Sequence, residues 1–234
     1  LNKLDGDVIF IKNIDNVIQN HKEINVLYKK ALAGIMVELQ NQIFNYLQAI
    51  EEGKDVNVKE IIDFVKHKLN IKVSKDVLKY TFENQIAHFK KILDRPIRVC
   101  GMVKNEGDTG GGPFRVRDSK GAVLLQIVET SQIDLTNPEQ IKIFSRSTHF
   151  NPVDLVCGIH NYKGDKFYLP DFVDNNSGFI VQKNKDGEQV KSYELPGLWN
   201  GAMAKWITIF VEVPLITFNP VKTVNDLLKP PHQP

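Results

Sequence analysis

The chain has 234 residues, of which 42% are hydrophobic and 25% charged, a composition typical of a globular protein with one good core or two modest ones. Thirty basic and 28 acidic side chains leave a net charge of +2, and no run concentrates the basic residues, which argues against a nucleic-acid partner. No signal peptide and no apolar run of about 18 residues is present, so neither secretion nor a membrane partner is predicted.

Two further features concern the origin of the chain. Cys100 and Cys157 lie in the apolar stretches IRVCGMV and DLVCGIH, which predicts buried free thiols in a reducing compartment, the cytoplasm. The chain begins at Leu1 without a methionine and soon enters GDVIFIKNIDNV, which reads as the middle of an α/β domain. We therefore expect a C-terminal fragment that lacks the N-terminal half of its protein; processing is the alternative.

The first predicted element is a strand within residues 7–16. The apolar run Val8–Ile11 predicts a buried parallel strand, and Asn13, Asp15 and Asn16 follow at its C-terminal end. Open α/β sheets bind ligands at the carboxyl ends of their strands. A carboxylate flanked by two amides suits Mg²⁺, which takes one or two carboxylates and completes its shell with water and phosphate. The alternative is that Asp15 and Asn16 only form a turn.

Residues 20–94 are predicted to be helical. Apolar side chains at three- and four-residue spacings predict a first helix from Asn20 to about Glu51. Val58–Leu69 forms a second amphipathic segment, and Ser74 is expected to cap a third helix that ends near Leu93. No chemistry is evident here, so we interpret residues 20–94 as a helical insertion.

Strand-like segments return at Ile97–Val103, followed by the polar loop KNEGDTGGGPF. The glycines at 110–112 allow the backbone to approach a ligand closely, although a flexible surface loop is the usual role of such a triplet. The strand AVLLQIVETSQI then carries Glu129, a carboxylate in apolar surroundings. It requires a partner, either sugar hydroxyls or an internal arginine such as Arg115 or Arg117.

The remaining elements complete an alternating α/β pattern. Ser145–Ile159 is strand-like, turns are expected at residues 163–165 and 186–187, and the spacing in Gly197–Phe210 predicts a helix before a last strand at Val211–Ile216. His149 and His160 do not form a recognisable metal pair; His149 is interpreted as a structural histidine, with a ligand contact as the alternative. The predicted organisation is residues 1–19 as the strand and metal-site segment, 20–94 as the insertion, 95–228 as the rest of the α/β domain and 229–234 as a tail.

The segment TFNPVKTVNDLL contains the most specific motif. Lys222 lies between Pro220-Val221 and a helix-start signal formed by Thr223 and the pair Asn225-Asp226. An ammonium group beside a helix N-terminus can bind a phosphate together with backbone amides. The alternative is a salt-bridged surface lysine in a loop.

The segment PVKTVNDLL resembles the C-terminal signature of the UDP-sugar pyrophosphorylases, the UTP:sugar-1-phosphate uridylyltransferases. The segments FIKNIDNV, GGGPFRV…LQIVETSQI, THFN and LPGLWNGAMAKW are similar to further segments of that family, in the same order. The whole chain most closely resembles the C-terminal half of an uncharacterised bacterial family described only as a domain of unknown function. The resemblance implies a nucleotide-diphospho-sugar transferase-like α/β fold (GT-A, Rossmann-like) with a mixed sheet and an inserted helical segment, whose N-terminal part is missing.

The implied reaction joins a sugar 1-phosphate to a nucleoside triphosphate, UTP, and releases pyrophosphate. The resemblance implies that Asp15 holds Mg²⁺, that Asn16 beside it contacts the substrate, and that Lys222 pairs with the sugar phosphate or the α-phosphate. Gly111 and Gly112 close on the sugar phosphate. The fragment alone is expected to have little activity, and the sequence indicates no oligomeric state.

Two further residues complete the implied site, since Glu129 and Asn151 match positions that orient the sugar hydroxyls. The loop departs from the family pattern, because Glu106 and Asp108 stand where basic residues usually precede the glycines. Two alternatives therefore remain open: a non-catalytic relative that binds a nucleotide-sugar, or an interaction module that docks through helices 20–94.

Overall fold

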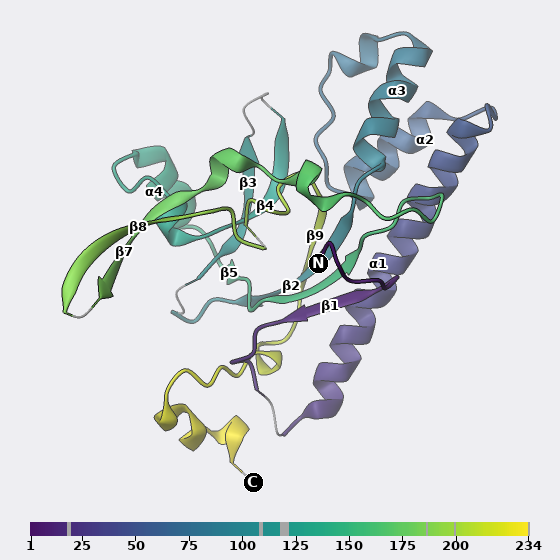
Figure 1. Ribbon diagram of the computed structural model, residues 1–234. Coiled ribbons are helices and arrows are strands. Elements are labelled where there is room, and N and C mark those ends of the chain that lie inside the picture. The colour runs from purple at the N-terminus through teal and green to yellow at the C-terminus, as the bar shows by residue number, and fades with distance from the viewer. Residues whose placement is uncertain (18–19, 108–109, 118–121, 186, 199, 234) are drawn as a thin grey trace.

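A mixed β-sheet forms the centre of the computed structural model, which describes residues 1–17, 20–107, 110–117, 122–185, 187–198 and 200–233 (Figure 1). The sheet has five strands, in the order β1-β6-β2-β5 with β9 also paired to β2. Their bounds are β1 Ile9–Lys12, β2 Ile97–Lys104, β5 His149–Phe150, β6 Asp154–Gly158 and β9 Ile207–Glu212. Among the strands that the structure describes, only β2 and β9 pair in parallel, so the predicted α/β class with a mixed sheet is confirmed.

Strand β1 differs from its prediction. It pairs antiparallel to β6, with Ile9 opposite Cys157 and Lys12 opposite Asp154. Within the described residues β6 is its only neighbour, and the Phe10 side chain is 48% exposed. The prediction of a buried parallel strand is therefore wrong: the apolar run Val8–Ile11 reflects an end strand, whose alternate side chains face solvent.

Three helices within residues 22–93 pack on one face of this sheet (Figure 1). Their bounds are α1 Lys22–Glu51, α2 Val58–Asp63 continued by a π-helical turn Phe64–Lys68, and α3 Phe82–Leu93. The fourth helix, α4 Pro138–Phe144, lies apart from them. The helical character of 20–94 is as predicted, but Thr81 and not Ser74 caps α3, by accepting a bond from the amide of Asn84. Ser74 precedes only a short 3₁₀ turn, Val77–Lys79.

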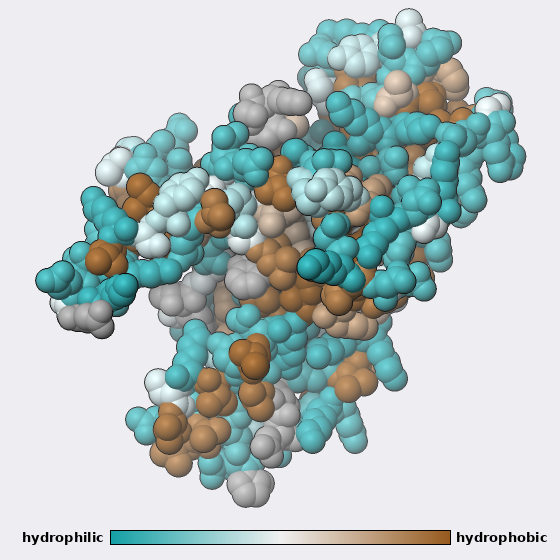
Figure 2. Space-filling model, in the orientation of Figure 1, coloured by the Kyte–Doolittle hydropathy of each residue, from teal (hydrophilic) through white to brown (hydrophobic). Residues whose placement is uncertain are grey.

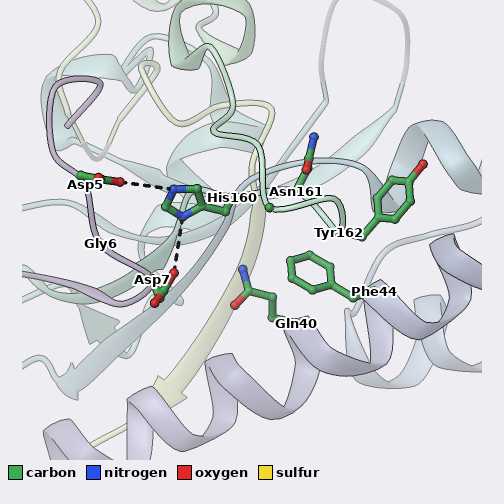
Figure 3. A pocket seen from close by; sticks show the side chains of 9 residues that line it. Asp5, Gly6, Asp7, Gln40, Phe44, His160, Asn161 and Tyr162 are labelled. Atoms are coloured by element: carbon green, nitrogen blue, oxygen red, sulfur yellow. Dashed lines mark ion pairs between the residues drawn. The ribbon is translucent and has the colours of Figure 1, made fainter.

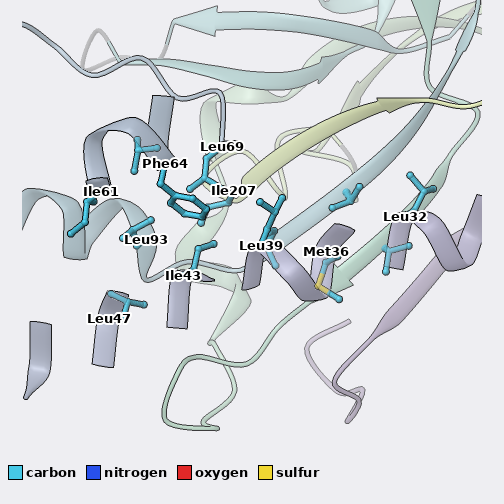
Figure 4. Close-up of a cluster of buried hydrophobic side chains, with 14 of the residues drawn as sticks. Leu32, Met36, Leu39, Ile43, Leu47, Ile61, Phe64, Leu69, Leu93 and Ile207 are labelled. Carbon is cyan, nitrogen blue, oxygen red and sulfur yellow. The ribbon is translucent and has the colours of Figure 1, made fainter. Parts of the chain in front are cut away.

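Two hydrophobic clusters lie on the two faces of the sheet, because neighbouring residues of a strand point to opposite sides. The first packs α1 against α2, α3 and one face of the sheet. Figure 4 shows its members Leu32, Met36, Leu39, Ile43, Leu47, Ile61, Phe64, Leu69, Leu93 and Ile207. The second, behind the sheet, contains both cysteines together with Ile127, Met203 and Trp206. The predicted buried free thiols are thus confirmed. None of the described helices is both long and apolar enough to cross a membrane.

Two hairpins extend from the sheet, β3 Gly112–Arg117 with β4 Val123–Val128 and β7 Phe179–Lys185 with β8 Glu188–Glu194. The second projects as an arm (Figure 1). Asp186 of its predicted turn, like Trp199 and Asp108, lies outside the described residues.

The region before the C-terminus contains two wrong predictions. Residues 200–205 form turns rather than a helix, and the last strand is Ile207–Glu212 rather than Val211–Ile216. Gly201 adopts a φ of 78°, which a helix interior does not allow. The β-branched run ITIFVE then satisfies strand preferences, and Pro214 starts a 3₁₀ turn, Leu215–Thr217.

Candidate functional site

The segment that follows β1 lies beside the C-terminal segment that contains Lys222. The carbonyl of Asp15 accepts a hydrogen bond from the amide of Val221 at 2.8 Å, and Asn16 forms a β-bridge with Pro220. The two motifs at opposite ends of the sequence therefore meet, and Lys222 directly follows the residue that joins them.

The side chain of Asn16 holds this junction together. Its Nδ2 donates to the carbonyl of Thr217 at 3.1 Å, and its Oδ1 accepts from the amide of Asn219 at 3.0 Å. The residue is only 3% exposed. Both ends of the amide are thus used by backbone groups, which gives Asn16 a positioning role in the structure; its predicted contact with substrate stays a prediction.

Asp15 carries a carboxylate oxygen whose environment suits a cation. Its Oδ1 is buried, and no group in the described part of the chain bonds to it. Burying a carboxylate oxygen that accepts no hydrogen bond destabilises the fold unless a cation or a water molecule contacts that oxygen. The described ranges contain no group of three or more His, Cys, Asp or Glu side chains placed for a metal ion. Mg²⁺ fits this arrangement, since it can use a single protein carboxylate together with water and phosphate oxygens.

Lys222 lies at the start of a short 3₁₀ helix, Val224–Leu228, with its side chain exposed. Thr223 is the N-cap of that helix, as predicted, and the Asp226 carboxylate accepts from the amides of Lys222 and Thr223 at 2.9 and 2.7 Å. The pKa of Asp226 is lowered, first by its hydrogen bond from Lys229 and then by these amides. Asp226 is thus engaged by neighbours, and the ammonium of Lys222 faces solvent.

A second group of predicted residues gathers around the glycine loop. The carbonyl of Gly111 accepts a bond from the amide of Asn151 at 2.7 Å, and a Cβ at Gly111 would lie 3.0 Å from Oε1 of Glu129. Glu129 also caps the 3₁₀ turn Thr130–Gln132. Gly112 begins β3 and would place a Cβ 3.2 Å from the carbonyl of His149. The absence of a side chain at both glycines is what allows this close packing.

Asn151 is buried, and half of its side chain is unused. Its Oδ1 accepts from the amide of Val153 at 3.0 Å, whereas its Nδ2 has no acceptor among the residues described. Val153 has a φ of 56°, unusual for a β-branched residue, and its carbonyl accepts from the amide of Asn13 at 3.2 Å. An unpaired buried donor beside a strained turn makes Asn151 a candidate for a ligand contact.

The two groups form one region. Bonded contacts lead from Gly111 through Asn151 and Val153 to Asn13, two residues before Asp15. The rings of Phe150 and Phe218, which flank the two groups, meet edge to face with centroids 4.8 Å apart. Hydrophobic side chains remain exposed near the Lys222 end, as Figure 2 shows over the C-terminal segment, where Val224 and Leu228 are 82% and 73% exposed.

A cavity of about 220 Å³ adjoins the glycine loop and is lined by Asn105, Gly110, Gly112, Phe114, Thr130, Phe144, Ser147, His149 and Phe150. A larger depression of about 600 Å³ lies elsewhere, between the N-terminal segment, α1 and the loop after β6 (Figure 3). His160 lies there, 3.7 Å from Asp5 and 3.9 Å from Asp7. None of the predicted site residues lines the depression, and of them only Gly112 lines the smaller cavity. We place the candidate site at the glycine loop beside this cavity and at the Asp15–Lys222 junction.

Sequence reasoning missed Arg98, a buried arginine on β2 that links β4 to β9 through hydrogen bonds. Arg98 is fully buried; its Nε donates to Thr208 Oγ1 at 2.9 Å, and its Nη2 donates to Gln126 Oε1 at 3.3 Å. Burial lowers its pKa. Arg115, considered above as a partner of Glu129, instead bonds Asn70 at 2.6 Å. The available signal was an arginine inside the apolar strand IRVCGMV.

Comparison with known proteins gives three results. A protein-family model described as "Domain of unknown function (DUF4301)" matches residues 1–233. No curated protein matches. Among solved structures, similarity extends to a mutant UDP-glucose pyrophosphorylase from Leishmania major in complex with UDP-glucose, with 19% identity, 64% of this chain and 33% of that chain covered, and a TM-score of 0.36.

A UDP-glucose phosphorylase from Trypanosoma brucei is similar at 16% identity, with 72% of this chain and 38% of that chain covered and a TM-score of 0.37. The chain therefore spans about a third of the length of these proteins, 33% and 38%. At this identity the likeness concerns the fold alone.

Proposed function

This chain belongs to the family described as a domain of unknown function, DUF4301, and on that premise we propose that it is part of a nucleotidyltransferase-like protein. The proposed reaction is attack by a sugar 1-phosphate oxygen on the α-phosphorus of a nucleoside triphosphate, UTP, with release of pyrophosphate. The observation that supports the proposal is the hydrogen bond between Asp15 and Val221, because it brings together the two motifs to which the proposal assigns phosphate and metal binding.

Transfer of a nucleotidyl group requires positioning and charge neutralisation rather than covalent help from the protein. Asp15 would hold Mg²⁺ through its unpaired Oδ1. When bound, the ion supplies stabilisation of the charge that develops on the phosphates. Lys222 pairs its exposed ammonium with a phosphate oxygen, and Asn16 keeps the two segments in register.

The glycine-loop group supplies the sugar subsite in this proposal. Asn151 has a buried amide nitrogen free to donate to a sugar hydroxyl, within the limits of the described chain. Glu129 lies against Gly111 and accepts from sugar hydroxyls on the same side. Gly111 and Gly112 admit the sugar phosphate close to the backbone, since any side chain there would occupy the space.

The test is pyrophosphate release by the full-length protein from UTP and glucose 1-phosphate in the presence of Mg²⁺. Lys222→Ala is expected to reduce turnover roughly 100-fold, the order of loss seen when a group that stabilises transition-state charge is removed. Lys229→Ala is the matched control, since it removes the same charge from the same segment, where the Lys229 ammonium pairs with Asp226 at 2.8 Å. Turnover of Lys222→Ala within a few-fold of the wild type would disprove the phosphate role.

One observation favours a second candidate, a relative that binds a nucleotide-sugar without catalysis. Glu106 precedes the glycines, where a phosphate-binding loop is expected to be basic. Calorimetric titration with UTP, UDP-glucose and UDP-N-acetylglucosamine, with and without Mg²⁺, separates the two. Binding without any pyrophosphate release would favour the non-catalytic relative, and metal-dependent release would exclude it.

A further inference from the structure

The cavity of about 220 Å³ adjoins the residues to which the proposed function assigns the sugar. Each of those residues has a neighbour in the chain that lines the cavity. The neighbours are Gly112, Thr130 and Phe150, which adjoin Gly111, Glu129 and Asn151. A sugar held by these three residues would therefore direct one of its substituents into the cavity.

The described lining of the cavity carries no permanent charge. None of its nine residues is Asp, Glu, Lys or Arg. His149 is the one titratable residue among these nine, and its two ring nitrogens are bonded to Thr148 and Glu212, at 2.8 and 3.0 Å. A charged group that entered the cavity would lose its water without gaining a partner of opposite charge. The cavity accordingly suits an uncharged part of a ligand.

Aromatic rings form much of the cavity wall, since Phe114, Phe144 and Phe150 are among its lining residues. Two of these rings lie against the glycines. A Cβ at Gly112 would be 3.0 Å from Cε2 of Phe114, and a Cβ at Gly110 would be 3.7 Å from Cδ2 of Phe150. A sugar hydroxyl placed against such a wall would lose its hydrogen bonds to water, whereas a methyl group gains free energy when it is buried there.

A hydroxyl group interrupts the aromatic wall beside Gly112. Oγ of Ser147 would be 3.5 Å from a Cβ at that glycine, and it donates to the carbonyl of His149 at 3.2 Å. A hydroxyl oxygen that donates its proton keeps lone pairs that can accept a hydrogen bond from an N–H group. The cavity thus combines apolar rings with a hydrogen-bond acceptor, as an acetamido group with its methyl and its N–H requires.

We propose that the glycine-loop cavity binds the acetamido group of an N-acetylated amino-sugar phosphate, with the methyl group against Phe114 and Phe150 and the N–H directed to Ser147. The inference rests on the proposed function for the sugar phosphate itself and deepens it by naming the substituent. A hydroxyl in place of the acetamido group has no methyl to fill the apolar space. An ammonium group finds no carboxylate in the described lining.

The test is calorimetric titration of the full-length protein with three ligands that differ only in the group on the second sugar carbon. N-acetylglucosamine 1-phosphate carries the acetamido group, glucosamine 1-phosphate an ammonium and glucose 1-phosphate a hydroxyl. The wild type is expected to bind the acetamido ligand at least tenfold more tightly than either of the others, a preference of the order that one methylene group gives in an apolar pocket.

Two variants test whether the acetamido group lies in the cavity. Gly110→Ala adds a methyl group at an ordinary contact distance, 3.7 Å from the Phe150 ring, so it should fold like the wild type in thermal unfolding while it takes space from the cavity. Its preference for the acetamido ligand is expected to fall below threefold. Ser147→Ala removes the acceptor and should weaken binding of the acetamido ligand alone, by roughly fivefold. Gly34→Ala, within α1 and with nothing within 4 Å of the added atom, is the control and should keep the full preference.

The inference is overturned if the wild-type preference is smaller than tenfold, or if Gly110→Ala keeps a preference of threefold or more. It is also overturned if none of the three ligands binds. Pyrophosphate release from UTP is scored separately with each sugar phosphate. Release with equal use of the acetamido and hydroxyl ligands would remove this inference and leave the proposed function standing, whereas selective binding without release would do the reverse.

Discussion

The carbonyl of Asp15 accepts a hydrogen bond of 2.8 Å from the amide of Val221, and this bond joins the segment after β1 to the segment before the 3₁₀ helix Val224–Leu228. Asp15 offers an unpaired carboxylate oxygen, and Lys222 an exposed ammonium, on either side of it. The hydrogen bond thus brings the backbone of a carboxylate residue next to the backbone that leads into a lysine, the arrangement on which the proposed phosphate site depends.

The junction predicts a large effect for Asn16→Ala. The substitution removes two hydrogen bonds and leaves the Thr217 carbonyl and the Asn219 amide without their partner in a buried site. We expect a loss of about 3 kcal/mol in the free energy of unfolding, measured by urea denaturation. Asn184→Ala, on the exposed hairpin strand β7, is the control and should change stability by less than about 0.5 kcal/mol. Equal effects of the two variants would contradict the role given to Asn16.

The unpaired carboxylate oxygen of Asp15 leads us to expect that Mg²⁺ raises the thermal stability of the protein, an effect that can be measured without an activity assay. If its free oxygen binds the ion, Mg²⁺ stabilises the folded protein by mass action, about 1.4 kcal/mol at roughly ten times the dissociation constant. Thermal unfolding should therefore shift upward in Mg²⁺ for the wild type and stay unchanged for Asp15→Asn. A shift of the same size in both would place the ion elsewhere.

The elements that were predicted correctly are those with a strong local pattern. Helix α1 and strand β2 carry their periodicity in neighbouring residues, so their existence follows from local spacing. The wrong helix at Gly197–Phe210 shows the limit of this reasoning, because Leu198, Ala202 and Trp206 fit a helical face by spacing alone. Gly201 has a positive φ, and a Cβ there would clash with Ser177, whose proximity no local pattern reveals.

The sequence motifs proposed a set of site residues but could not give their arrangement in space. The motifs identified Asp15, Asn151 and Lys222, yet the bond that joins the first to the last motif spans almost the whole chain. Arg98 was missed for a related reason. Its partners Gln126 and Thr208 come from β4 and β9, and only the folded sheet shows that a buried guanidinium has hydrogen-bonding partners there.

The two cysteines predict a specific dependence on pH. Burial raises the pKa of Cys100 and of Cys157 to about 12, so at pH 8 the folded protein holds both as thiols. A thiol-specific disulfide reagent should detect neither group in the native protein at pH 8 and both in urea. Rapid labelling of the native protein would contradict their burial.

The same shift has a consequence for stability with a definite sign. When the pKa of an acid is higher in the folded state than in the unfolded state, the protonated acid contributes to folding stability. This contribution is complete below the unfolded pKa, about 8.5 for cysteine, and is lost as the pH rises towards the folded pKa of about 12. Wild-type stability should thus fall more between pH 8 and pH 10.5 than that of a variant carrying both Cys100→Ala and Cys157→Ala. Parallel curves for the two proteins would show that other groups account for the fall.

The glycine loop allows a matched pair of substitutions with opposite expected signs. A Cβ at Gly111 would lie 2.7 Å from Cγ2 of Ile127, closer than non-bonded carbons approach, so Gly111→Ala should destabilise the protein by about 1–3 kcal/mol. Gly34 lies within helix α1 with nothing within 4 Å of the added atom, and Gly34→Ala should stabilise by about 0.5–1 kcal/mol.

Urea unfolding of the two glycine variants measures both signs. Gly111→Ala should also weaken binding of glucose 1-phosphate, because the new methyl group displaces Glu129, whose Oε1 lies 3.0 Å from it. Gly34→Ala should leave that binding unchanged, since α1 covers the sheet on the face away from Ile127 and Trp206. If Gly111→Ala unfolds like the wild type, the loop can relax around a methyl group, and the close packing assigned to it is not a requirement of the site.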